Sequence, residues 1–193
     1  MEHTPTPEQS LKLINEMMLQ AKRSFQKVHF HFLLWGVLFA LAGFASHFLI
    51  AAGSQYHWLV WPTAGVIGGI ITAIKGSRDG KATSAVTMMD RVHQFLWLSY
   101  VLTLVLLIIA LVKNRIDPNP FVLVLTGLPT FVSGALMRFR PLMIGGILFW
   151  SIGFASFFFL QQYSALVYSL AITIGYIIPG ILLKREEDGV RPT

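Results

Sequence analysis

Histidine is the side chain of this sequence best suited to proton transfer or metal binding, because the 193 residues include no cysteine. His29, His31 and His93 stand at one boundary of the apolar segments, and His47 and His57 stand at the other. His93 could bind a metal ion together with His29 or His31, but no carboxylate or third ligand accompanies the pair. Histidines at such boundaries usually serve as amphipathic anchors. The sequence therefore predicts no metal site and no cofactor.

Two short motifs contain a candidate nucleophile or acid, and neither is complete. Ser133-Gly134 resembles part of an intramembrane serine protease motif, but Phe131 stands where that motif has glycine. Asp79-Gly80 resembles the start of an alcohol-phosphotransferase motif, whose later aspartates are missing here. A serine hydrolase also needs a base and oxyanion donors that converge on the serine. We therefore predict no catalytic residue and no enzymatic activity.

The elements that hold these residues are strongly apolar. The chain is 54% hydrophobic and 12% charged, against about 25% charged residues in ordinary soluble proteins. Residues 95–112 contain just two polar side chains, Ser99 and Thr103, and about 18 apolar residues in a row are enough to cross a bilayer. The sequence predicts an all-α integral membrane protein.

We expect six transmembrane helices, arranged as three hairpins. Their predicted ranges are 29–52, 58–74, 92–112, 121–137, 141–160 and 163–183, which together form a bundle over residues 28–184. No Asp, Glu, Lys or Arg lies within any of these spans. Because intramembrane charges usually mark ion paths, proton relays or catalytic sites, this absence argues against an ion-coupled pump and against carboxylate-based catalysis.

The formal net charge of +6 comes from basic residues that flank the spans. Thirteen of the fifteen basic residues stand on the side of the N-terminus: Lys12, Lys22, Arg23, Lys27, Lys75, Arg78, Lys81, Arg91, Arg138, Arg140, Lys184, Arg185 and Arg191. Lys113 and Arg115 stand on the opposite side. The positive-inside rule therefore predicts a cytoplasmic N-terminus and a cytoplasmic tail at 185–193. Since the charges follow the span ends, we expect no nucleic-acid partner.

The polar segment 1–27 is predicted to contain a tail and an amphipathic helix. Thr6 and Gln9 form a capping box around Pro7, at the first helical position. The apolar stripe consists of Leu11, Ile14, Met18, Ala21, Phe25 and Val28, and Leu13 and Met17 widen it. Such a helix can lie on the inner leaflet, and its spacing also fits a docking or dimerisation helix. Both interpretations stay open.

Parts of the first two spans reappear near the end of the chain. GFASHFLI at 43–50 matches GFASFFFL at 153–160, and LVWPTAGVIGGIITAI from Leu59 resembles LVYSLAITIGYIIPGI from Leu166. One interpretation is an internal repeat of three two-span units. The alternative is a chance similarity between apolar segments, and the sequence does not decide between the two.

Small residues and prolines inside the spans are the candidates for helix packing or for a pore. They are Gly65, Gly68, Gly69, Pro129, Ser133, Gly134, Thr173, Gly175 and Pro179. Small residues spaced by four let helices approach closely, within one bundle or in a homodimer. Prolines bend helices, and broken helices can form transporter sites, although kinks also serve packing alone.

Five segments carry a resemblance to known proteins: SLKLINEMM, HFLLWGVL, WPTAGVIGGIITAIKG, FVSGALMRFRPLMIGG and YIIPGILLK. Together they resemble a group of small, uncharacterised six-span inner-membrane proteins of a kind common in the Bacteroidota. The resemblance implies a bacterial inner-membrane location and brings no activity. We expect a non-enzymatic membrane protein with a structural or regulatory role, whose amphipathic helix engages the lipid bilayer, a protein partner or a second copy. The alternative is a small transporter or channel for an uncharged solute.

Overall fold

The structure is a computed structural model that describes residues 28–80, 88–159 and 161–189. Every regular element in these residues is helical, and no strand occurs among them. The α-helices are α2 (Val28–Ala51), α3 (Val60–Gly80), α4 (Met88–Lys113), α5 (Asn119–Leu136), α6 (Arg140–Phe158), α7 (Ser164–Ile172) and α8 (Ile178–Gly189). Two 3-10 turns, His57–Leu59 and Gln161–Tyr163, precede α3 and α7, and a π-helical turn, Thr173–Ile177, joins α7 to α8. The predicted amphipathic helix within 1–27 lies outside the described residues.

Six helical stretches of the described chain are long and apolar enough to cross a membrane. They are His29–Ala51, His57–Arg78, Asp90–Lys113, Asn119–Leu136, Arg140–Phe158 and Gln161–Arg185, with mean hydropathy between 1.4 and 2.7 in their most apolar windows. The prediction of six membrane-length helices is therefore confirmed in number, length and composition. Three helices run at least four residues beyond their predicted spans: α3 continues past residue 74 to Gly80, α4 begins at Met88 rather than at residue 92, and α8 continues past residue 183 to Gly189. In α3 the added turns contain Lys75 and Arg78, which favour helix.

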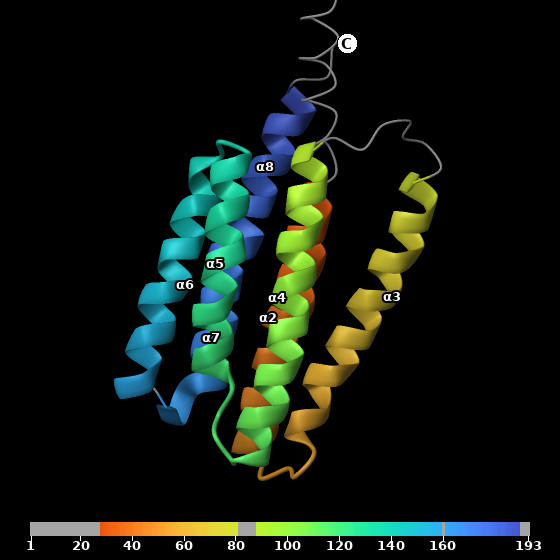
Figure 1. Ribbon diagram of the computed structural model, residues 1–193. Helices are drawn as coiled ribbons and strands as arrows, with labels where there is room; N and C mark the ends of the chain where they lie inside the picture. Colours follow the sequence, from red (N-terminus) through yellow and green to blue (C-terminus); the bar gives the residue numbers. More distant parts are fainter. Residues whose placement is uncertain (1–27, 81–87, 160, 190–193) are drawn as a thin grey trace, which may run out of the picture.

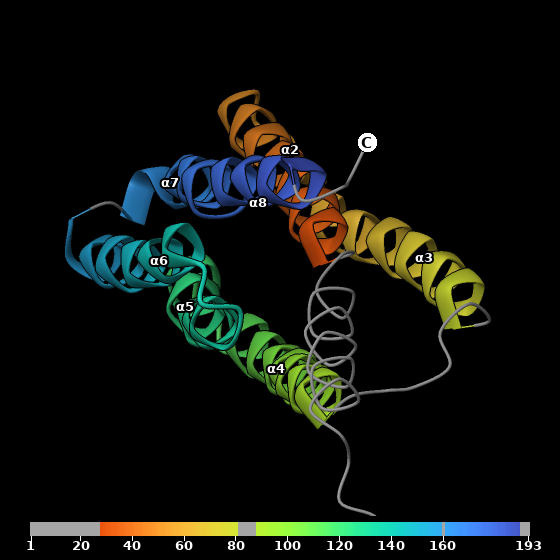
Figure 2. The ribbon, with the colours of Figure 1, turned by 90° about the horizontal axis from the view of Figure 1, so that it is seen from above.

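The helices run alternately up and down (Figure 1). The starts of α2, α4 and α6 and the ends of α3, α5 and α8 therefore lie at one end of the molecule. Seen from above, α3, α2 and α7/α8 form one row, and α4, α5 and α6 form a second (Figure 2). The rows meet at α6 and α7 and spread apart toward α3 and α4.

Helices α5 and α6 pack closely because glycines face each other across their interface. A Cβ atom added to Gly127 would lie 2.9 Å from the carbonyl oxygen of Gly146, and a Cβ on Gly146 would lie 2.9 Å from the carbonyl oxygen of Gly127.

A tight turn joins α5 to α6. Arg138 takes a left-handed conformation, with φ of 55°, and the N–H of Phe139 donates to the Gly134 carbonyl at 2.8 Å. This is the bonding pattern of a Schellman cap.

Helix α2 packs against the last membrane-length helix rather than only against its neighbour in sequence. A Cβ on Gly36 would lie 3.0 Å from the Cβ of Tyr176, and a Cβ on Gly43 would collide with the Ser169 side chain. The first and last spans of the chain therefore form one interface, with α2 crossing α7 and α8 (Figure 2).

Burial divides the bundle into two parts. In the most apolar window of α5, 56% of the residues are buried, and the window of the sixth span has 50%. The corresponding shares are 11% for α3 and 6% for α4. Helices α3 and α4 therefore expose most of their apolar surface to whatever surrounds the bundle, and the packed interior belongs mainly to α2 and α5–α8.

Candidate functional site

Seven polar or partly polar side chains of the interior gather where α4, α5 and the π-helical turn meet. We call this group the interior polar cluster; it consists of His93, Trp97, Tyr100, Thr126, Thr130, Ser133 and Tyr176. Three members on α4 and three on α5 each follow a spacing of four and then three residues. This spacing puts each trio on one helix face. Because α4 and α5 are antiparallel, the two faces meet in reverse order.

Tyr100 and Thr126 form one contact of the cluster. Their hydroxyl oxygens are 2.7 Å apart. The Thr126 hydroxyl donates to the Val122 carbonyl at 2.6 Å, so the Tyr100 hydroxyl is the donor to Thr126. Thr126 is 2% exposed, and a bond made at such a buried position ties α4 to α5 in a medium where few other partners exist.

Thr130 and Tyr176 form the second contact, which joins α5 to the sixth span. Thr130 Oγ1 lies 3.1 Å from Tyr176 Oη and 2.7 Å from the Thr126 carbonyl oxygen. The tyrosine ring packs edge-on against Phe32 and Phe149, with ring centroids 5.4 and 5.1 Å away. The hydroxyl pair is thus enclosed by aromatic rings.

Ser133 forms the third contact, near the end of the bundle where α4 begins. The Trp97 indole N–H donates to Ser133 Oγ at 3.2 Å, and His93 Nδ1 lies 3.5 Å from the same oxygen. Trp97 also packs edge-on against Phe32, at 5.8 Å between centroids. Ser133 of α5 therefore contacts two side chains of α4, and one of them, Trp97, also contacts α2.

The π-helical turn has an identifiable cause in the sequence. Pro179 has no backbone N–H, so the carbonyl of Gly175, four residues earlier, cannot receive an α-helical bond from it. Just before this proline the Ile178 N–H donates to the Thr173 carbonyl, five residues back. The turn brings Tyr176 to the cluster and sets Gly175 against the ring of Phe149, 2.5 Å from where a Cβ would lie. Single π-helical turns are frequent at functional sites.

A row of aromatic rings attaches α3 to the rest of the bundle. The ring of Trp35 stacks on Phe39 at 5.4 Å, Phe39 lies 6.5 Å from Trp61, and Trp61 packs edge-on against Tyr168 at 5.0 Å. These rings come from α2, α3 and α7. Gly68 fits beneath Trp35, because a Cβ there would lie 2.7 Å from the indole ring.

The Ser133–His93 pair brings a hydroxyl near an imidazole, which is one part of a nucleophilic site. Ser133 is fully buried and accepts the Trp97 N–H, and it does not line the pocket between α4 and α5 that Tyr100 and Pro129 border. No group of three metal-binding side chains occurs in the described part of the chain. The arrangement joins α4 to α5.

The small residues predicted to pack or line a pore have different surroundings. Gly68, Gly134 and Gly175 lie in helix contacts; a Cβ on Gly134 would lie 2.6 Å from the Met143 backbone nitrogen of α6. Gly65 and Gly69 have no atom within 4 Å of where a Cβ would lie. Gly65 and Gly69 therefore lie on the same helix as Gly68 but do not share its close packing against Trp35.

The predicted polar and proline candidates do not meet around one space. Ser133 belongs to the interior polar cluster, and the Thr173 hydroxyl donates to the Ser169 carbonyl of its own helix at 2.8 Å. Pro179 is buried, and Pro129 helps to line a pocket of about 170 Å³ between α4 and α5. The predicted interfacial residues Leu11, Ile14, Met17, Met18 and Phe25 lie outside the described residues.

Ser133 and His93 were both candidates from the sequence, but their contact with each other and with Trp97 was not predicted. The signal is the matching pattern of His93, Trp97 and Tyr100 on one span and of Thr126, Thr130 and Ser133 on the next. Comparisons with protein-family models, with curated proteins and with solved structures found no match. The function proposed below therefore follows from the geometry of this chain alone.

Proposed function

We propose that this chain is a non-enzymatic integral membrane protein with a structural or regulatory role, and that it engages the bilayer or a protein partner. The N-terminal amphipathic segment and the sparsely buried α3 and α4 supply the contact surface. The packed part of the bundle, α2 with α5–α8, supplies a rigid scaffold for that surface.

One observation carries the proposal: the side chains of the interior polar cluster bond to one another, and of its members Tyr100 alone borders the pocket at Pro129. The hydroxyls of Thr126 and Thr130 and the indole of Trp97 each have a partner on another helix or on their own backbone. The surface pocket at Pro129 is small, about 170 Å³. A transport path would need polar groups that water or solute can reach, so the packing favours the structural role.

The proposed location is a bacterial inner membrane, with both termini in the cytoplasm. The supporting observation is that Lys75, Arg78, Arg138, Arg140 and Lys184 stand at helix ends that lie together in Figure 1. Lys113 ends α4 and Arg115 follows it, at the other end. Basic residues favour the cytoplasmic side of a membrane, and the resemblance to six-span bacterial proteins agrees with this location.

The proposal includes a repeat of three hairpins: α2/α3, α4/α5 and α6/α7–α8. Two glycines in matching positions support it, because Gly43 of α2 packs on α7 and Gly153 of α6 packs on α5. Each GFAS segment therefore contacts the second helix of a neighbouring hairpin. The third such interface would join α4 to α3, where the rows stand apart (Figure 2). Helix α4 contains no glycine, so it lacks the close contact of the other two.

Solute flux into vesicles separates this proposal from the transporter alternative. The purified full-length chain is reconstituted into liposomes, and uptake of glycerol and urea is followed by stopped-flow light scattering against protein-free liposomes. We expect equal rates, because the described interior offers no open polar path. Uptake that exceeds the control and rises with the amount of protein would favour a channel and contradict the structural role.

A further inference from the structure

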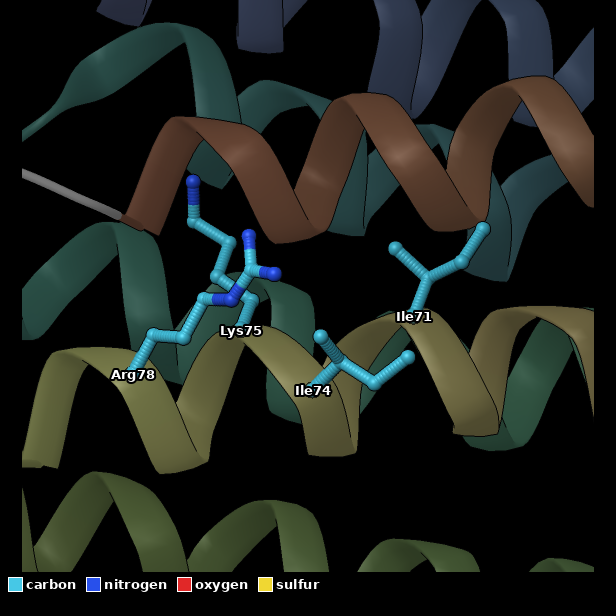
Figure 3. Close-up of a pocket in the computed structure, with 4 residues that line it drawn as sticks. All are labelled: Ile71, Ile74, Lys75 and Arg78. Atoms are coloured by element: carbon cyan, nitrogen blue, oxygen red, sulfur yellow. The ribbon is translucent and has the colours of Figure 1, made fainter.

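A surface pocket at the end of α3 combines positive charge with an aliphatic wall. It measures about 390 Å³ and is lined by Ile71, Ile74, Lys75 and Arg78 (Figure 3). These residues follow spacings of three, one and three, so they share one face of α3. The sticks in Figure 3 extend from α3 toward the start of α2. The pocket is therefore a shallow groove on the face of α3 that is turned toward α2, at the basic end of the bundle.

The two cations are held differently. Lys75 Nζ lies 3.7 Å from the centre of the Phe30 ring of α2, a cation–π contact that fixes the half-buried side chain against the neighbouring helix. Arg78 is exposed one turn further along. No carboxylate is among the described residues that line the groove. Among the described residues, the groove thus offers two positive charges and no lining acid.

The aliphatic part of the groove lies on the membrane side of the charges. Ile71 and Ile74 are 36% and 49% exposed, and they belong to the stretch His57–Arg78 that is apolar enough to cross a bilayer. A ligand that fits must place a negative group beside Lys75 and Arg78 and an apolar chain along the isoleucines. A phospholipid with a net negative headgroup has this shape, and basic pockets between helices on the cytoplasmic side are known to bind such headgroups.

We propose that the groove formed by Ile71, Ile74, Lys75 and Arg78 binds the phosphate of an anionic phospholipid. The guanidinium group of Arg78 can donate two parallel hydrogen bonds to phosphate oxygens, while Lys75 acts as a point charge held by Phe30. A zwitterionic headgroup carries its own cation, so it gains less from two adjacent positive side chains. The inference rests on the proposed bilayer location and orientation, and it is independent of whether the bundle transports a solute.

Lipid binding to the purified full-length chain tests the proposal. Native mass spectrometry compares phosphatidylglycerol with phosphatidylcholine for the wild type, for Lys75→Ala/Arg78→Ala and for the matched control Lys184→Ala/Arg185→Ala. The control removes the same charge from the same end of the bundle. We expect the wild type and the control to prefer phosphatidylglycerol, and the groove variant to bind it at least about tenfold more weakly.

Two further variants and a soluble phosphate ester show whether the groove itself binds the lipid. Arg78→Ala alone changes an exposed side chain, and Phe30→Leu removes the ring beneath Lys75 without changing charge; each should weaken phosphatidylglycerol binding if the groove is the site. Equal loss in the groove and control variants, or equal binding of phosphatidylcholine, would overturn the proposal. Binding of glycerol 1-phosphate as tight as that of the lipid would assign the groove to a soluble phosphate ester instead. Loss of lipid selectivity would leave the solute-flux result unchanged, so the lipid-binding proposal can fail while the proposed structural role stands.

Discussion

The hydroxyl pair between Thr130 and Tyr176 allows a quantitative test of the packed interior. Valine has nearly the shape of threonine, so Thr130→Val removes a hydroxyl without opening a large cavity. The Thr126 carbonyl still receives its helical N–H bond, so losing the 2.7 Å contact to Thr130 Oγ1 changes little. The main effect is on Tyr176 Oη, which loses the partner at 3.1 Å while the residue remains only 4% exposed.

The expected magnitude follows from the membrane setting. A buried polar group left without a partner costs about 1–3 kcal/mol in soluble proteins. Hydrogen bonds between transmembrane helices are weaker, about 0.6 kcal/mol on average and about 1.7 kcal/mol at most. We therefore expect Thr130→Val to lower the free energy of unfolding by about 1 kcal/mol. Tyr176→Phe should lower it by a similar amount, and the double variant by less than the sum of the two.

Equilibrium unfolding in mixed micelles with increasing SDS measures these differences. Thr103→Val is the matched control, because the Thr103 hydroxyl bonds at 2.8 Å to the Ser99 carbonyl of its own exposed helix face. We expect the control to change stability by less than about 0.5 kcal/mol. Additive effects of Thr130→Val and Tyr176→Phe, or an equal loss in the control, would refute the view that this pair joins α5 to the sixth span.

Three more outcomes follow from the geometry. Gly146→Leu should lower the free energy of unfolding by about 1–3 kcal/mol in the same assay, because its Cβ would lie 2.7 Å from a backbone nitrogen of α5. Gly69→Leu is the control and should cause no loss, because no atom lies within 4 Å of where its Cβ would be. Equal losses in the two variants would contradict the packing. Arg138→Gly should raise the free energy of unfolding by about 0.5–1 kcal/mol, because φ at this position is 55° and glycine adopts this conformation without strain. A lower free energy of unfolding would show that the arginine side chain stabilises the protein by more than its backbone strain costs. A reporter active only outside the cytoplasm should stay silent when fused after Lys184, and activity there would reverse the proposed orientation.

The number and approximate position of the long helices could be read from the sequence because each is a nearly continuous apolar run, whereas the ends of α3, α4 and α8 could not. Residues 95–112 are a clear case, since helices satisfy their own backbone groups in a bilayer. Periodicity within such a run is weak, so the sequence does not say which face meets which neighbour. The contact of Gly36 and Gly43 with the last span was beyond prediction for this reason.

The candidate site was only partly predictable. Ser133 stood out because it precedes a glycine, as in part of a serine protease motif, and Pro179 because proline breaks a helix. The proline predicts a break in the sixth helix, but not that the break is a π-helical turn that presents Tyr176 to Thr130. The contact of Phe149 with Gly175 at this turn joins distant parts of the chain, so the sequence did not reveal it. The matched spacing on α4 and α5 becomes informative once their antiparallel pairing is known.

The interface between α2 and the last span has a consequence for how the protein is made. Helix α2 leaves the ribosome well before α7 and the π-helical turn do, so Gly36 and Gly43 remain without their partners until residues 165–177 have been made. Helices α5 and α6, joined by the short turn at Arg138, can pair as soon as both are inserted. A chain cut short before Ser164 would display an unmatched small-residue face on its first helix. Membrane quality control could recognise such a face as the mark of an unfinished molecule.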